Sequence, residues 1–196
     1  MHSEASLKIV IVDDSAVRVA ILEEGLREAG HRHVIRVEGT DNLLERIYAI
    51  DPDVILIDLE NPSRDVLEQM FRVSRAVKRP IAMFVDQSDS ASIAAAVDAG
   101  VSSYIVDGLK KDRIKHILDI SISRFNAFSR ISTELEQTKS ALEERKVIDR
   151  AKGILMKRKG LSEEEAYTLL RTAAQNEKKR IAEIAQSIIT AAELLK

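Results

Sequence analysis

Short apolar segments alternate with amphipathic segments over the first 110 residues, and this alternation limits the folds that the chain can adopt. Five apolar segments are rich in β-branched residues: 7–12, 33–37, 53–57, 80–85 and 103–106. All except the second are nearly continuous in hydrophobicity, which is typical of strands buried on both faces of a sheet. Helical patterns lie between them, at 15–29, 41–50, 63–77 and 91–99. The alternation predicts an α/β fold, a doubly wound five-stranded parallel sheet with helices on both faces.

The second half of the chain has neither a strand pattern after this sheet nor a proline. We therefore expect 111–159 to form one long helix or two nearly continuous ones. Ser162 and Glu165 have the spacing of a capping box, which predicts a helix at 163–175, and a last amphipathic helix follows at 178–195. Counting the end of the long helix, the C-terminal part is expected to be a small three-helix all-α domain.

A heptad spacing marks the middle of the long helix. Phe128, Leu135 and Leu142 are seven residues apart, and Leu118 and Phe125 precede them. This repeat predicts a coiled-coil seam over the linker 111–145 and hence a homodimer. Polar residues at the alternate heptad positions would weaken the seam: Ser132, Lys139 and Lys146. The alternative is that the stripe packs against the chain's own C-terminal helices.

The net charge of −2 conceals an asymmetry. Residues 1–144 carry 18 Lys and Arg against 25 Asp and Glu, whereas 145–196 carry 12 against 7. The basic C-terminal part indicates either a partner with phosphates, such as a nucleic acid, or a basic helix that contacts only water. The chain has no cysteine, which excludes disulfides, thiolate nucleophiles and cysteine-based zinc sites.

The N-terminus, MHSEASLK, lacks the basic and then apolar layout of a signal peptide. No stretch approaches the roughly 18 uncharged apolar residues of a membrane-spanning helix. We therefore expect a cytoplasmic protein.

Acidic residues follow two of the predicted strands. Asp13 and Asp14 come after the first strand, and Asp58 comes after the third. In the flavodoxin-like strand order 2-1-3-4-5 these strands are neighbours, and ligands bind in the crevice outside their carboxyl ends. Carboxylates alone, with open positions, suit Mg²⁺, and beside that ion one carboxylate can attack a phosphoryl group. The alternative is that the three acids are ordinary loop residues.

With these residues, the segment 5–124 resembles the receiver domain of two-component response regulators. The resemblance is carried by Asp13, Asp14, Asp58 within DVILIDLENPS, and GVSSYIVDG at 100–108. It implies that Asp58 is the phosphoacceptor, and that Asp14, Asp58 and the Glu60 carbonyl bind Mg²⁺ directly while Asp13 binds it through water. It also implies that Tyr104 is the rotating aromatic residue of the receiver switch.

Two switch positions depart from the receiver pattern. Val85 stands where receivers have a Thr or Ser that bonds the phosphoryl group, and Asp107 stands where they have a Lys that pairs with it. An anion in place of that cation repels a phosphorylated Asp58. We therefore expect either inefficient phosphorylation or a switch that responds to another signal. Ser88 is a nearby candidate for the missing hydroxyl.

The basic residues of the C-terminal part lie along the end of the long helix and on the two helices that follow. Five of them are our candidates for contact with nucleic acid: Arg150, Lys152, Lys157, Arg171 and Lys179. Tyr167 is the only aromatic residue after Phe128, so it is the one candidate for base stacking, although a core or hinge role is the favoured interpretation. The helix count alone also allows a helix-turn-helix that binds DNA.

The segment 140–196 resembles the ANTAR domain, an RNA-binding output domain of transcription antiterminators. The resemblance is carried by the run VIDRAKGILM, by the Ser162–Glu165 cap, and by Ala166-Tyr167 and Leu170-Arg171. It implies a regulator that binds paired stem-loops in nascent leader RNA and so prevents a terminator hairpin from forming.

The segments DLENPSRD and YIVDGL are most similar to those of regulators of nitrate and nitrite assimilation. That resemblance implies control by a cytoplasmic nitrate-sensing partner, whereas a histidine kinase is the usual receiver partner. We expect no enzymatic activity beyond autophosphorylation chemistry. A DNA-binding response regulator and a protein-interaction switch without nucleic acid are the alternatives.

Overall fold

The computed structural model describes residues 6–59, 62–106 and 109–194. They form two compact units, Met1–Ser129 and Arg130–Lys196, and each is described by itself. The long helix α5, Ile114–Lys159, contributes its first part to the first unit and its last part to the second.

The first unit is built on a five-stranded parallel sheet. Its strands are β1 (Lys8–Val12), β2 (His33–Val37), β3 (Val54–Leu59), β4 (Ile81–Val85) and β5 (Ser103–Val106). Their order is β2-β1-β3-β4-β5, and every neighbouring pair is parallel. The predicted α/β fold and its strand order are confirmed.

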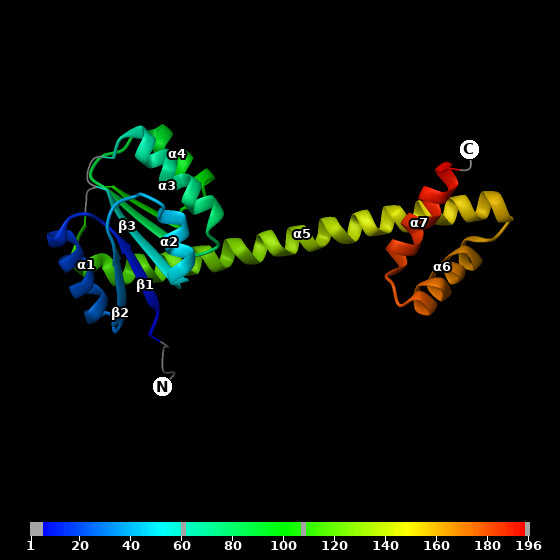
Figure 1. Ribbon diagram of the computed structural model, residues 1–196, viewed down its shortest axis with the longest axis horizontal. Helices are drawn as coiled ribbons and strands as arrows, with labels where there is room; N and C mark the ends of the chain where they lie inside the picture. The colour runs from blue at the N-terminus through cyan, green and yellow to red at the C-terminus, as the bar shows by residue number, and fades with distance from the viewer. Residues whose placement is uncertain (1–5, 60–61, 107–108, 195–196) are drawn as a thin grey trace. The chain divides into compact units, whose positions relative to one another are not determined.

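Helices cover both faces of this sheet (Figure 1). They are α1 (Ala16–Glu28), α2 (Leu43–Ile50), α3 (Arg64–Ala76) and α4 (Ser90–Asp98), together with the start of α5. Alternate side chains of β1 point to opposite faces: Ile9 and Ile11 pack with α1 and α5, and Val10 and Val12 pack with α2 and α3. Both faces are mainly apolar, which is why most of the strands appear as continuous hydrophobic runs in the sequence.

Gly25 allows α1 to lie close to the start of α5. A Cβ atom at this position would collide with Cδ1 of Ile114 and would lie 3.2 Å from the Lys111 carbonyl oxygen. A short 3₁₀ turn at Lys111–Arg113 precedes α5, so the α-helix begins three residues later than the sequence predicts. The expected segment is one uninterrupted helix rather than two.

The second unit consists of the end of α5, α6 (Glu163–Glu177) and α7 (Ile181–Leu194). The predicted capping box is confirmed, because the Ser162 hydroxyl accepts from the backbone of Glu165 and the Glu165 carboxylate accepts from the backbone of Ser162. Helix α6 ends at Glu177, two residues later than predicted, and its C-cap residue Lys178 has a left-handed backbone with φ 53°. The core is small and apolar: Ala151, Leu155, Ala166, Leu170, Ala174, Ile184, Ala185 and Ile189.

The heptad stripe of α5 is exposed. Phe128 is 67% exposed, and Leu135 and Leu142 are each 52% exposed. The alternative that the stripe packs against the chain's own C-terminal helices is therefore wrong for Leu135 and Leu142, which belong to the same unit as those helices. Leu118 is only 1% exposed and lies in the core of the first unit, so it is not part of a seam. None of the helices in the described part of the chain is long and apolar enough to cross a membrane.

Candidate acidic site and basic helical domain

Two of the three predicted acidic residues are buried at the carboxyl edge of the sheet. Asp13 follows β1 directly, and Asp58 is the fifth residue of β3. Their residues are 2% and 4% exposed. Ser15 caps α1 just after Asp13, and its backbone N–H donates to the Asp13 carboxylate at 2.8 Å. The parallel pairing of β1 with β3 is what places the two carboxylates at one site.

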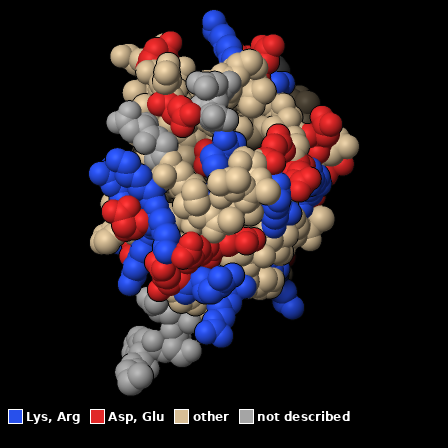
Figure 2. All heavy atoms as spheres, turned by 90° about the vertical axis from the view of Figure 1, so that its left-hand side faces the viewer, with Lys and Arg blue, Asp and Glu red and all other residues tan. Residues whose placement is uncertain are grey.

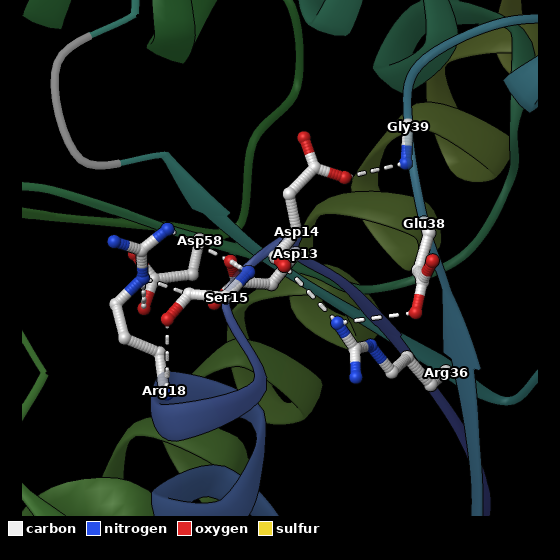
Figure 3. A network of polar contacts seen from close by, with 8 residues as sticks. All are labelled: Asp13, Asp14, Ser15, Arg18, Arg36, Glu38, Gly39 and Asp58. Carbon is white, nitrogen blue, oxygen red and sulfur yellow. Dashed lines mark hydrogen bonds and ion pairs between the residues drawn. The ribbon is translucent and has the colours of Figure 1, made fainter.

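A cation that the sequence analysis did not single out lies between these carboxylates (Figure 3). Arg18 of α1 donates to both oxygens of Asp13, from Nε at 3.1 Å and from a terminal nitrogen at 2.8 Å. Its Nε also lies 3.5 Å from Oδ2 of Asp58. This fork geometry is the arrangement in which a guanidinium holds a carboxylate most firmly.

The third carboxylate is turned away from the other two, as Figure 3 shows. Asp14 is exposed, and its Oδ1 accepts from the backbone N–H of Gly39 at 2.6 Å. Arg36 donates to the Asp14 carbonyl oxygen and pairs with Glu38. The side chain of Asp14 therefore ties the end of β1 to the loop after β2.

The predicted magnesium site is not formed in this arrangement. Among the described residues, no three acidic, histidine or cysteine side chains lie together as a metal ion requires. Asp13 and Asp58 face a guanidinium, and Asp14 faces Gly39. Receiver domains typically bind Mg²⁺ at this place, but the residues do not fit that ion as they lie here. The predicted carbonyl ligand of Glu60 falls outside the described residues.

The switch positions are only partly described. Val85 ends β4 and is completely buried. Because this residue is a valine, its side chain offers no hydroxyl. The Tyr104 hydroxyl lies 3.0 Å from the Ser88 hydroxyl oxygen, so Ser88 contacts the residue to which the resemblance assigns the rotating aromatic position. Asp107 lies outside the residues that the structure describes.

One face of the molecule carries exposed charges of both signs. Figure 2 shows one end of the molecule, where lysine and arginine side chains alternate with aspartate and glutamate side chains. A surface of this kind produces no strong field of one sign, which a highly charged partner would require.

Three of the five candidate basic residues of the second unit are already in ion pairs. Arg150 pairs with Glu193 at 2.7 Å and Lys179 pairs with Glu177 at 2.7 Å. Lys152 pairs with both Asp149 and Glu163 at 2.7 Å. The hydrogen bonds that Lys152 donates to these acids raise its pKa, and the hydrogen bond to Glu177 raises the pKa of Lys179.

The other two candidates, Lys157 and Arg171, are exposed and make no ion pair with any described residue. Exposed ion pairs contribute only about 0–1 kcal/mol each, so a phosphate can replace the acid in such a pair. Lys157 and Arg171 can bind a phosphate without first releasing a carboxylate.

Tyr167 lies in a groove of about 620 Å³ between α5 and α6. The groove has charged, apolar and small lining residues: Ala141, Glu144, Arg145, Ile148, Asp149, Lys152, Gly153, Met156, Glu163 and Tyr167. Tyr167 is 42% exposed, which excludes the core role considered from the sequence. Nothing lies within 4 Å of a Cβ placed on Gly153, so the groove is open beside this glycine.

A five-stranded parallel sheet of this order with acidic residues at its carboxyl edge defines the class of response regulator receivers. The model of the response regulator receiver domain matches residues 9–119, and the model of the ANTAR domain matches residues 136–189. The chain belongs to the receiver family and carries an ANTAR domain at its C-terminal end. The resemblances stated from the sequence are confirmed, and members of this family are regulatory proteins.

Relatives share this arrangement. The chain is 27% identical over 180 residues to the transcriptional regulatory protein PdtaR of Mycobacterium tuberculosis, covering 90% of this chain and 88% of PdtaR. It is 37% identical over 76 residues to the nitrate regulatory protein of Klebsiella oxytoca, covering 39% of this chain and 19% of that protein. These relatives support an antiterminator type of regulator.

Solved structures share the fold of the first unit. A CheY-like receiver domain protein from Methanospirillum hungatei has a TM-score of 0.54 at 15% identity, over 63% of this chain and 98% of that one. A pilus assembly-related protein from Burkholderia pseudomallei has a TM-score of 0.55 at 20% identity, over 63% of this chain and 95% of that one. At these identities the likeness concerns the fold alone.

Proposed function

We propose that the chain is an antiterminator that binds paired stem-loops of a nascent leader RNA through its ANTAR domain. The observation that carries this proposal is the match of an ANTAR domain to the basic end of α5, to α6 and to most of α7. Bound RNA hairpins would prevent a competing terminator hairpin from forming.

The proposed RNA surface combines free cations with an exposed aromatic ring. Lys157 and Arg171 are exposed for contact with phosphates, and Arg150, Lys152 and Lys179 can contribute by exchanging a carboxylate for a phosphate. Tyr167 in the groove offers a face for one unpaired base. Proteins read RNA sequence mostly on splayed loop bases, because the A-form major groove is too narrow for side chains.

The active form in this proposal is a homodimer joined along α5. Four large apolar side chains on its outer surface support the seam: Phe128, Ile131, Leu135 and Leu142. Two linked ANTAR domains bind two hairpins more tightly than one domain can, because the second contact is intramolecular. Lys139 and Lys146 at alternate heptad positions keep the seam weak, so that dimerisation can be regulated.

The receiver controls this output in the proposal. Asp58 is our candidate phosphoacceptor, and Asp13, Asp14 and Asp58 are our candidate ligands of Mg²⁺, which requires an arrangement different from the one described above. With Val85 in place of a hydroxyl residue, a partner protein is the better candidate signal than a histidine kinase. The likeness to the nitrate regulatory protein suggests genes of nitrate and nitrite assimilation as the target.

The proposal is tested with the full chain in a gel-shift experiment at one salt concentration. The probes are a two-hairpin RNA from the leader of a nitrate-assimilation operon, the same RNA with scrambled loops, and duplex DNA. Preference for the intact leader RNA is the expected result. Preference for duplex DNA would indicate a DNA-binding regulator. Binding to none of the probes would indicate a protein-interaction switch without nucleic acid.

A further inference from the structure

Arg18 occupies a place on α1 where an arginine is unfavourable by helix electrostatics alone. It is the third residue of the helix, so its charge lies near the positive end of the helix dipole. No acidic residue lies in this first turn of α1 to offset it. The energy that holds Arg18 in place must therefore come from outside the helix, and its contacts include the carboxylates of Asp13 and Asp58.

Those carboxylates in turn require a cation. The side chain of Asp13 is completely buried, and that of Asp58 is only 4% exposed. Two buried carboxylates at one site repel each other, and each loses hydration on burial, so a positive charge beside them stabilises the site. Arg18 supplies this charge with two hydrogen bonds to Asp13 and an ion pair of 3.5 Å to Asp58. Its side chain is 25% exposed, so it reaches the site from the surface.

We propose that Arg18 is the built-in cation of this acidic site and competes with Mg²⁺ for the carboxylates of Asp13 and Asp58. The third expected ligand, Asp14, is held by the backbone of Gly39 at 2.6 Å and supports this arrangement. Arg18 then offsets one of the two negative charges and stabilises the site without a metal ion, and a metal ion can bind only when Arg18 leaves.

Because of this competition, we expect the receiver to respond more weakly to phosphoryl donors than other members of the family. Receivers depend on a bound cation for phosphoryl chemistry, so a site that Arg18 closes responds weakly to phosphoryl donors. The departure agrees with Val85 at the end of β4, where the phosphoryl-binding hydroxyl is also missing. The inference concerns the receiver alone and does not depend on RNA binding, so its test contains no RNA.

The test compares the full chain with Arg18→Met, which keeps a side chain of similar length without the charge. Mg²⁺ alone is the probe, by isothermal titration and by thermal unfolding in EDTA or in excess Mg²⁺. We expect Arg18→Met to unfold at a lower temperature than the parent in EDTA and to regain stability in Mg²⁺. We expect its Kd for Mg²⁺ to be at least about tenfold lower than that of the parent.

Two further variants locate the effect. Arg27→Met removes an exposed arginine from the last turn of the same helix, and it should leave the Kd for Mg²⁺ at the parent value. Adding Asp58→Asn to Arg18→Met should abolish the gain, because a proposed ligand is lost. Should Arg18→Met fail to fold, Arg18→Lys keeps the charge but loses the fork, and its Kd for Mg²⁺ should still fall below the parent value.

Three results would overturn the inference. Equal Mg²⁺ affinity of the parent and the Arg18 variants would show that Arg18 does not compete with the ion. A gain in Mg²⁺ affinity that persists after Asp58→Asn is added would show that the metal ion binds elsewhere. Unchanged stability of Arg18→Met in EDTA, with no gain in Mg²⁺ affinity, would show that Arg18 does not neutralise the site.

Discussion

The ammonium of Lys152 in α5 lies 2.7 Å from a carboxylate oxygen of Glu163 at the start of α6. Asp149 contacts the same ammonium at 2.7 Å, and the lysine side chain is only 15% exposed. Lys152 therefore joins two helices of the ANTAR domain. Lys157, five residues further along, is exposed and makes no ion pair with any described residue.

Lys152→Glu should destabilise the C-terminal domain. The change places a third carboxylate beside Asp149 and Glu163, and it replaces two attractions by two repulsions. We expect a lower midpoint of thermal unfolding for this domain, with a smaller loss for Lys152→Met. A midpoint equal to that of the parent protein would show that the two ion pairs contribute nothing to stability. Loss of RNA binding by Lys152→Glu alone therefore does not identify an RNA contact.

Lys157→Glu should weaken RNA binding without a loss of stability. A lysine that contacts a phosphate releases about one counterion, so its reversal should lower the slope of log K against log salt by about 1. Lys115→Glu, an exposed lysine in the receiver unit, is the matched control with the same charge change. Equal slopes for the two variants would remove Lys157 from the RNA surface.

Tyr167→Ala should reduce affinity for leader RNA by about 1–3 kcal/mol, the usual value of one base stacked on an aromatic ring. Tyr167→Phe keeps the ring and should bind almost as the parent does. The side chain is 42% exposed, so neither change should greatly alter the unfolding midpoint. If Tyr167→Phe loses as much affinity as Tyr167→Ala, the hydroxyl and not the ring carries the contact.

Periodicity in the sequence was sufficient to predict the sheet and the helices, whereas the strand order came from the flavodoxin-like type of fold. The strands are predictable because burial on both faces requires continuous apolar segments such as 81–85. The junction at 111–113 was missed, because a 3₁₀ turn continues the helical pattern without interruption. The end of α6 was missed because Lys178 adopts a left-handed conformation that favours glycine or asparagine over lysine.

The acidic site was only half predictable. Asp13 and Asp58 stand at strand ends and are visible as a pattern. Arg18 is one arginine in an amphipathic helix, and only the tertiary fold brings its guanidinium to a carboxylate 40 residues away. The rotation of Asp14 depends in the same way on the backbone of Gly39, which is 25 residues distant.

Two glycines within helices should respond oppositely to alanine. Gly25→Ala forces α1 and α5 apart at Ile114, so we expect a loss of about 1–3 kcal/mol despite the better helix propensity. At Gly153 nothing lies within 4 Å of an added Cβ, so alanine should stabilise the protein by about 0.5–1 kcal/mol. Urea unfolding of the two variants measures both values. A stabilising Gly25→Ala would contradict the close approach of the two helices.

The most direct test of the account is the affinity of the full chain for a leader RNA with two hairpins and for the same RNA with one. The paired arrangement along α5 predicts that two hairpins bind at least about a hundredfold more tightly. Replacing Leu135 and Leu142 by Glu should abolish this difference and leave binding to one hairpin unchanged. Equal affinity of the parent protein for the two RNAs would contradict the proposal that two ANTAR domains act together.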